Sequence, residues 1–146
     1  MLKNFIKVGT ITLGDHCDVT DPCYKKDVWC RTTMPVRPGK YNCFMLLDKK
    51  NGRVKRSMIV HESVKTDMFY QDYFQIGVDA GLAGYFNNKP DYTDKEWQEF
   101  CDKIGTASYL IEDDMFVTST GWGDGGYPLR ICLDGGDVVA ATIEFI

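Results

Sequence analysis

Short runs of alternating apolar and polar residues, separated by turns rich in glycine and aspartate, constrain this chain more than any other feature. Residues 5–13 alternate in this way and are rich in β-branched side chains. Residues 41–47 and 54–61 repeat the pattern on either side of Asn51-Gly52, a pair typical of a tight type I′ turn. A period of two predicts β-strands, and the central pair predicts a hairpin.

The same pattern continues toward the C-terminus. Further strands are expected at residues 74–79, 84–86, 115–120, 127–133 and 138–145, with a final tight turn at residues 134–137. The first two of these strands form either a pair or one strand bent around Ala80-Gly81. Residues 15–39 contain several aspartates and prolines, so they are expected to be largely loop with short extended pieces. Long loops of this kind are often functional.

One segment has a helical pattern instead. Thr93 and Glu96 have the spacing of a capping box, and Phe100 and Ile104 belong to an apolar stripe of helical period. Gly105 is expected to end this helix. The sequence therefore predicts a mainly β (α+β) fold, an antiparallel sheet or β-sandwich with one packed helix near residues 93–104.

Size and composition indicate one soluble domain. A chain of 146 residues with 44% hydrophobic and 26% charged residues, without a repeat or linker, is expected to fold as a single domain over residues 1–146. A net charge of -4 disfavours nucleic acid as a partner. No apolar run approaches the ~20 residues of a membrane span, and the N-terminus does not resemble a signal peptide, so a cytoplasmic location is expected. Homo-oligomerisation stays open.

The six cysteines are interpreted as reduced thiols that pack as small hydrophobic side chains. An even number of cysteines favours disulfides only in a secreted chain, and a core of this size needs no cross-links. Structural zinc sites use closely spaced cysteine pairs, which this sequence lacks. Neither a metal nor a cofactor is predicted.

Three turns, at residues 21–24, 78–81 and 121–128, contain the candidate site residues. Each turn carries a carboxylate at the end of a predicted strand, and the third of them adds exposed main-chain N–H groups and aromatic faces. The candidate ligand-binding residues are Asp21, Tyr24, Asp79, Gly81, Trp122, Gly123, Asp124, Gly125 and Tyr127. A structural role competes with this interpretation, because a turn aspartate often accepts hydrogen bonds from nearby main chain. The functional interpretation requires the three turns to meet.

Three functions are compatible with these residues. The first is a binding domain for a small ligand, phosphorylated or nucleotide-like, held by glycine-lined main chain and aromatic faces. The second is a metal-assisted hydrolase that uses the aspartates of the three turns. The third is a protein-interaction module that uses a sheet edge or an aromatic patch.

In their order along the chain, the turns resemble those of a known family, the bacterial and phage proteins grouped as domain of unknown function 4241. The resemblance rests on an Asp-Pro turn at residues 20–24, Pro-Gly-Lys-Tyr at 38–41, Gly-Val-Asp-Ala-Gly at 77–81 and Gly-Trp-Gly-Asp-Gly-Gly-Tyr-Pro at 121–128. It runs from about residue 8 to residue 145. It implies a shared fold and a shared site region, and the family brings no assigned activity. The occurrence of the family in phages extends the first function to a phage-type protein that sequesters a nucleotide signal.

Overall fold

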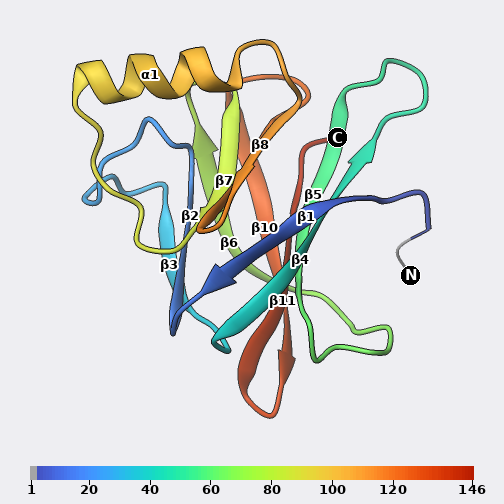
Figure 1. Ribbon diagram of the computed structural model, residues 1–146. Coiled ribbons are helices and arrows are strands. Elements are labelled where there is room, and N and C mark those ends of the chain that lie inside the picture. Colours follow the sequence, from blue (N-terminus) through green and yellow to red (C-terminus); the bar gives the residue numbers. More distant parts are fainter. Residues whose placement is uncertain (1–2) are drawn as a thin grey trace.

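The computed structural model describes residues 3–146 as two antiparallel β-sheets and one helix (Figure 1). The six-stranded sheet has the order β1 (Ile6–Leu13), β4 (Gly39–Leu47), β5 (Val54–His61), β11 (Asp137–Glu144), β10 (Gly125–Asp134) and β6 (Gln71–Val78). The five-stranded sheet has the order β3 (Thr32–Pro35), β2 (His16–Thr20), β7 (Leu82–Phe86), β9 (Met115–Ser119) and β8 (Tyr109–Glu112). The predicted β-rich fold with one helix is confirmed.

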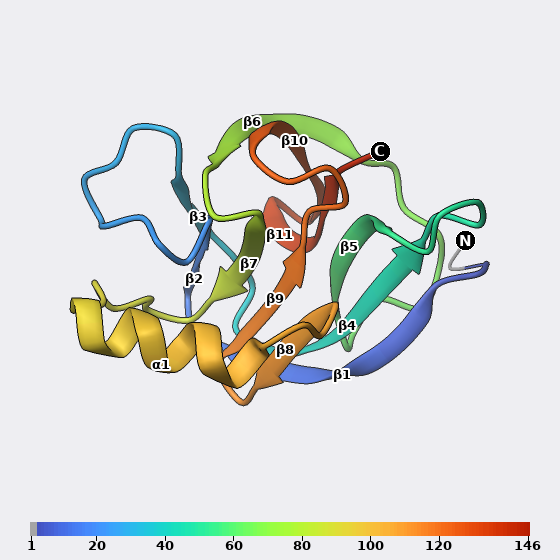
Figure 2. The same cartoon turned by 90° about the horizontal axis from the view of Figure 1, so that it is seen from above.

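The main core lies between the two sheets. Tyr41 and Leu129 from the six-stranded sheet and Tyr85 and Phe116 from the five-stranded sheet are completely buried there. Each large side chain removed from water contributes roughly 1.5–3 kcal/mol to folding. Seen from above, both sheets curve around this core (Figure 2), and the apolar residues of alternating strand positions point into it.

The helix α1 (Asp94–Ile104) covers the outer face of the five-stranded sheet. Phe100 and Ile104 turn inward from the helix and form a second apolar cluster with sheet residues. The predicted capping box is present, because Thr93 accepts a hydrogen bond from the N–H of Glu96 and its own N–H donates to the Glu96 carboxylate. Gly105 caps the other end, as predicted.

The hairpin of β4 and β5 is confirmed, but its predicted type I′ turn is wrong. A type I′ turn needs positive φ at both central residues, and only Gly52 has it (71°). Asp48 explains the difference, since its carboxylate accepts hydrogen bonds from the N–H groups of Lys50 and Asn51 at 2.9 and 3.3 Å. This side chain folds the connection into a longer loop that closes between Asp48 and Arg53.

The expected relation between the strands on either side of Ala80-Gly81 is wrong. β6 and β7 neither pair nor form one bent strand, because the chain crosses from one sheet to the other at residues 79–81. Residues 15–39 are largely loop with short extended pieces, as predicted, and these pieces are β2 and β3, which pair with each other. The final turn is as predicted, with Asp134 opposite Asp137 and positive φ at the two glycines between them.

All six cysteines are free thiols, and Cys17, Cys30, Cys43 and Cys132 are buried. Within residues 3–146, no helix has the length and apolar character needed to cross a membrane.

Candidate functional site

The three predicted turns meet at one end of the sandwich, and Asp21 joins the first two. Its side chain is completely buried. One carboxylate oxygen accepts a hydrogen bond from the N–H of Cys23 at 2.9 Å. The other accepts hydrogen bonds from the N–H groups of Asp79 and Ala80, at 2.8 and 2.6 Å. Asp21 therefore holds the turn after β2 against the turn after β6.

The third turn lies against the second through main-chain contacts. The carbonyl of Gly81 accepts a hydrogen bond from the N–H of Thr120 at 3.1 Å. A Cβ placed on Gly81 would lie 3.7 Å from the Cα of Gly123. The Tyr127 hydroxyl donates to the Gly123 carbonyl at 2.8 Å. The strand that follows this turn also pairs with β6, with Gly125 opposite Val78.

Although the turns converge, their side chains mostly bind their own scaffold. The Asp21 oxygens are engaged by three N–H groups, and the ring of Tyr127 packs edge-on against Phe145. Trp122 is exposed, with the Arg53 guanidinium 4.7 Å above its ring. Among residues 3–146, no three histidine, cysteine or acidic side chains form a group that could hold a metal ion. The hydrolase hypothesis thus gains no support from the geometry.

Tyr24 connects the first turn to a second polar cluster, which contains two buried cations. Its main-chain carbonyl accepts a hydrogen bond from the Lys89 ammonium at 2.9 Å and one from the Arg31 guanidinium at 3.4 Å. Lys89 is 1% exposed, and the side chain of Arg31 is 4% exposed. Charged side chains are almost never buried to this extent without a partner.

The buried positive charge exceeds the buried negative charge in this cluster. Asp18 is its buried carboxylate, 3.6 Å from the Arg31 guanidinium, and it also accepts hydrogen bonds from the Thr33 hydroxyl and the Lys89 N–H. The Lys89 ammonium instead contacts the Pro90 carbonyl at 2.8 Å. Burial, reinforced by the neighbouring Arg31 charge, lowers the pKa of Lys89 to about 8. Two buried cations therefore share one buried carboxylate, and the exposed Asp91 carboxylate is a further negative charge near Lys89.

A cavity of about 240 Å³ opens beside this cluster. It is lined by His16, Asp18, Lys26, Arg31, Thr33 and Asn88. We call it the basic pocket. None of the turn residues predicted to bind a ligand lines it, although the Tyr24 carbonyl accepts hydrogen bonds from Arg31, which lines the pocket, and from Lys89, which does not.

His16 adds a titratable group to the basic pocket. Its Nδ1 lies 2.8 Å from the Asp15 carboxylate, and its Nε2 lies 2.6 Å from the Asn88 side-chain oxygen. These hydrogen bonds raise the pKa of His16 above its ordinary value. Because both ring nitrogens face oxygen acceptors, the imidazolium form fits this arrangement, and protonation adds positive charge to the pocket.

Comparison of the chain with known protein families, curated proteins and solved structures finds no match. The resemblance to domain of unknown function 4241 therefore stays a prediction that rests on the turn motifs. The function has to be argued from the pocket geometry alone.

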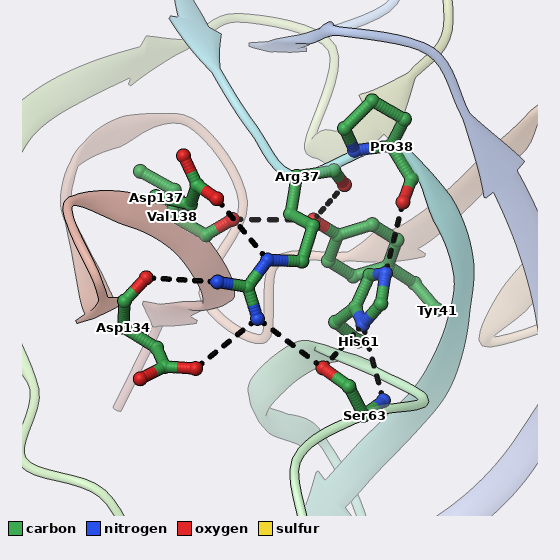
Figure 3. A network of polar contacts seen from close by, with 8 residues as sticks. All are labelled: Arg37, Pro38, Tyr41, His61, Ser63, Asp134, Asp137 and Val138. Atoms are coloured by element: carbon green, nitrogen blue, oxygen red, sulfur yellow. Dashed lines mark hydrogen bonds and ion pairs between the residues drawn. The ribbon is translucent and has the colours of Figure 1, made fainter.

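A third polar network, centred on Arg37, links the connection between β3 and β4 to the turn at residues 134–137 (Figure 3). The Arg37 guanidinium contacts the carboxylates of Asp134 and Asp137 at 3.1 and 3.2 Å. Nearby, His61 donates from Nε2 to the Pro38 carbonyl, so Nδ1 is the acceptor that faces the Ser63 hydroxyl at 2.7 Å.

This serine and histidine resemble a nucleophile and its base, but their geometry is that of a local turn. Nδ1 of His61 also faces the main-chain N–H of Ser63 at 3.1 Å, so one residue supplies both donors. A base that activates a nucleophile needs its lone pair directed at the hydroxyl. The pair therefore closes the chain after β5, and we assign it no catalytic role.

Few features of the amino-acid sequence pointed to the basic pocket. Lys89 lies in an Asn-Lys-Pro segment that is typical of an exposed turn, and Arg31 follows a loop rich in charged residues. The useful signal was the length of the loop in residues 15–39, which suggested a functional segment. That loop supplies most of the pocket lining.

Proposed function

We propose that this protein binds a small phosphorylated ligand, with the phosphate group seated in the basic pocket between Lys26, Arg31 and His16. The observation that carries the proposal is the excess of buried positive charge beside an open cavity. A buried charge without full compensation costs several kcal/mol. A bound anion supplies the missing negative charge, so the arrangement favours an anionic ligand.

The pocket is organised before any ligand arrives. Two groups contact the Arg31 guanidinium, the Asp18 carboxylate at 3.6 Å and the Tyr24 carbonyl at 3.4 Å. Because both contacts are long, N–H donors of the planar guanidinium remain for a phosphate. The main chain of Lys26 is fixed by a hydrogen bond of 2.9 Å to the Asp91 carboxylate. Preformed donors reduce the entropy lost on binding and so increase affinity.

The size of the pocket limits what enters it. A volume of about 240 Å³ lies below the ~300–1,000 Å³ of typical ligand sites, so the phosphate and a small part of the molecule attached to it fit inside. The rest of the ligand extends into solvent. The nucleotide-like ligand expected from the sequence is one member of this class, along with sugar phosphates.

Two adjacent lysines provide a matched test by titration calorimetry with ribose 5-phosphate. Lys26 lines the pocket, whereas its exposed neighbour Lys25 does not. We expect Lys26→Met to weaken binding about tenfold, corresponding to ~1.4 kcal/mol, and Lys25→Met to leave it nearly unchanged. The two variants lose the same charge, so general electrostatic attraction cannot explain a difference between them. Equal losses, or no saturable heat with the unmodified protein, would contradict the proposal.

The pH dependence provides a second test, for which sulfate is the suitable probe because its charge is constant near neutrality. The pKa of His16 is raised above its ordinary value, so lowering the pH through this raised pKa adds one positive charge to the pocket. We expect sulfate affinity to increase as the pH falls from 8 to 6 and expect His16→Gln to remove part of this increase, while the remainder comes from Lys89, whose pKa is about 8. An unchanged pH profile in the variant would show that His16 does not contribute.

A further inference from the structure

A second cavity, of about 670 Å³, lies on the outer face of the six-stranded sheet, away from the basic pocket. Met58 and Val60 of β5 and Ala140 of β11 form its floor, and Val60 is paired with Ala140 across the two strands. Val64, Met68 and Tyr70, from the connection between β5 and β6, form one wall, and Phe5 lies on another side. We call this the apolar cleft.

The apolar cleft is lined by apolar and by charged side chains, and Lys65, Thr66 and Asp67 of the connection between β5 and β6 are among them. The apolar wall residues pack with the buried residues Cys132, Val139 and Ala140. Arg56 lies two positions before Met58 on the same strand and also lines the cleft. It pairs with Glu144 across β5 and β11. Alternate residues of a strand share one face of the sheet, so an apolar floor leads directly to a guanidinium.

Arg56 is incompletely paired in this position. Its Nη2 is 3.6 Å from the Glu144 carboxylate, which lies 3.4 Å from the Arg130 guanidinium as well. Its Nε is buried and has no hydrogen-bond partner among residues 3–146. The Phe5 ring lies 5.8 Å from the guanidinium carbon, and the Arg56 side chain as a whole is 27% exposed. A buried donor without an acceptor costs ~1–3 kcal/mol, and a ligand oxygen would remove this cost.

We propose that the apolar cleft binds a small amphiphile, an apolar monocarboxylate whose body lies over Met58 and Val60 and whose carboxylate meets Arg56. The volume is within the ~300–1,000 Å³ of ordinary ligand sites. The apolar floor and the adjacent Arg56 guanidinium match the two parts of such a molecule. Methionine adds flexible apolar surface, which adapts to ligands of somewhat different shape. This site is independent of phosphate binding in the basic pocket.

The methionines offer a direct test by nuclear magnetic resonance, with octanoate as the probe and methionine methyl groups labelled with ¹³C. Met58 and Met68 line the cleft, whereas Met34 and Met115 are buried in other clusters. We expect octanoate to shift the first two signals saturably and to leave the other two unchanged. Shifts of all four signals, or of none, would overturn the proposal.

The role of Arg56 is tested by comparing octanoate with 1-octanol, which has the same body without the charge. We expect the unmodified protein to prefer octanoate about tenfold, and Arg56→Gln to abolish this preference while octanol still binds. Lys50→Gln removes a charge from the exposed tip of the same hairpin and should leave the preference intact. If Arg56→Gln keeps the preference, the proposed position of the carboxylate is wrong.

A variant that fills the cleft separates binding there from weak binding elsewhere. Ala140→Leu directs a larger side chain from the floor into the cleft. We expect it to weaken both octanoate and octanol while the Met34 and Met115 signals keep their native positions, which shows that the fold is retained. Undiminished binding of both probes by this folded variant would place them outside the cleft and overturn the proposal.

Discussion

Asp21→Ala is expected to lower the free energy of unfolding by about 4 kcal/mol, a large share of the stability of a small domain. The substitution removes the acceptor of three main-chain N–H groups, those of Cys23, Asp79 and Ala80. Hydrogen bonds to a charged group contribute ~1.5–3 kcal/mol each, and donors left buried without an acceptor add to the loss. Urea unfolding followed by circular dichroism measures the change.

Asp124→Ala is the matched control for this prediction. Asp124 lies in the adjoining turn, but it is exposed and its carboxylate makes no hydrogen bond or ion pair within residues 3–146. We expect this substitution to change the free energy of unfolding by no more than about 0.5 kcal/mol. If Asp21→Ala were equally mild, the carboxylate would not be the link between the turns. The contrast separates structural aspartates from surface ones within one cluster.

Local patterns were sufficient to predict most of the elements. The capping box of Thr93 and Glu96, the glycine after the helix and the period of two in the long strands depend on residues close in sequence. The last hairpin was equally clear, because two consecutive glycines permit the positive φ angles of its turn. These interactions form wherever the segment is placed in the fold.

Partner choice could not be read from the same patterns. β6 and β7 are separated by three residues, yet they belong to different sheets, and only the complete set of strand pairings decides this. β2 was hidden because buried Asp18 interrupts its apolar pattern. In the first hairpin, the Asp48 side chain reorganised a turn whose central pair favoured a tighter form.

The candidate site shows the same division between local and distant effects. Aspartates and glycines correctly marked three turns that meet, but the burial of Asp21 gives it a structural role that sequence alone cannot distinguish from ligand binding. The basic pocket was missed because lysine and arginine are usually exposed. Burial of Lys89 and Arg31 results from the packing of the loop over the sheet, which is a property of the whole fold.

Above pH 9, the stability of the protein is expected to fall steeply, because its buried thiols resist ionisation. Burial raises the pKa of Cys43 to about 12, against 9.0 for an ordinary thiol, and raises that of Cys17 further. Both side chains are completely buried. Between the unfolded and folded pKa values the folded protein holds more protons, so raising the pH favours unfolding. Each such thiol lowers the free energy of unfolding by up to ~1.4 kcal/mol per pH unit.

Lys89 acts in the opposite direction. Its pKa is about 8 in the folded protein and 10.5 when unfolded, so between these values the unfolded chain binds more protons and stability rises with pH. From pH 8 to 9 this lysine acts before the thiols do, and above pH 9 two fully buried thiols outweigh it. We therefore expect the free energy of unfolding to reach its maximum close to pH 9.

Urea unfolding from pH 7 to 11, in the presence of a reductant, tests both the expected rise in stability below pH 9 and the expected fall above it. Cys43→Ala creates a small cavity and lowers stability at every pH, so the slope against pH is the quantity to compare. Above pH 9, we expect the free energy of unfolding of the variant to fall less steeply with pH than that of the unmodified protein. The difference should correspond to about one proton, or ~1.4 kcal/mol per pH unit, because one buried thiol has been removed. An unchanged slope would mean that the Cys43 thiol ionises as readily in the folded protein as in the unfolded chain, which its burial opposes.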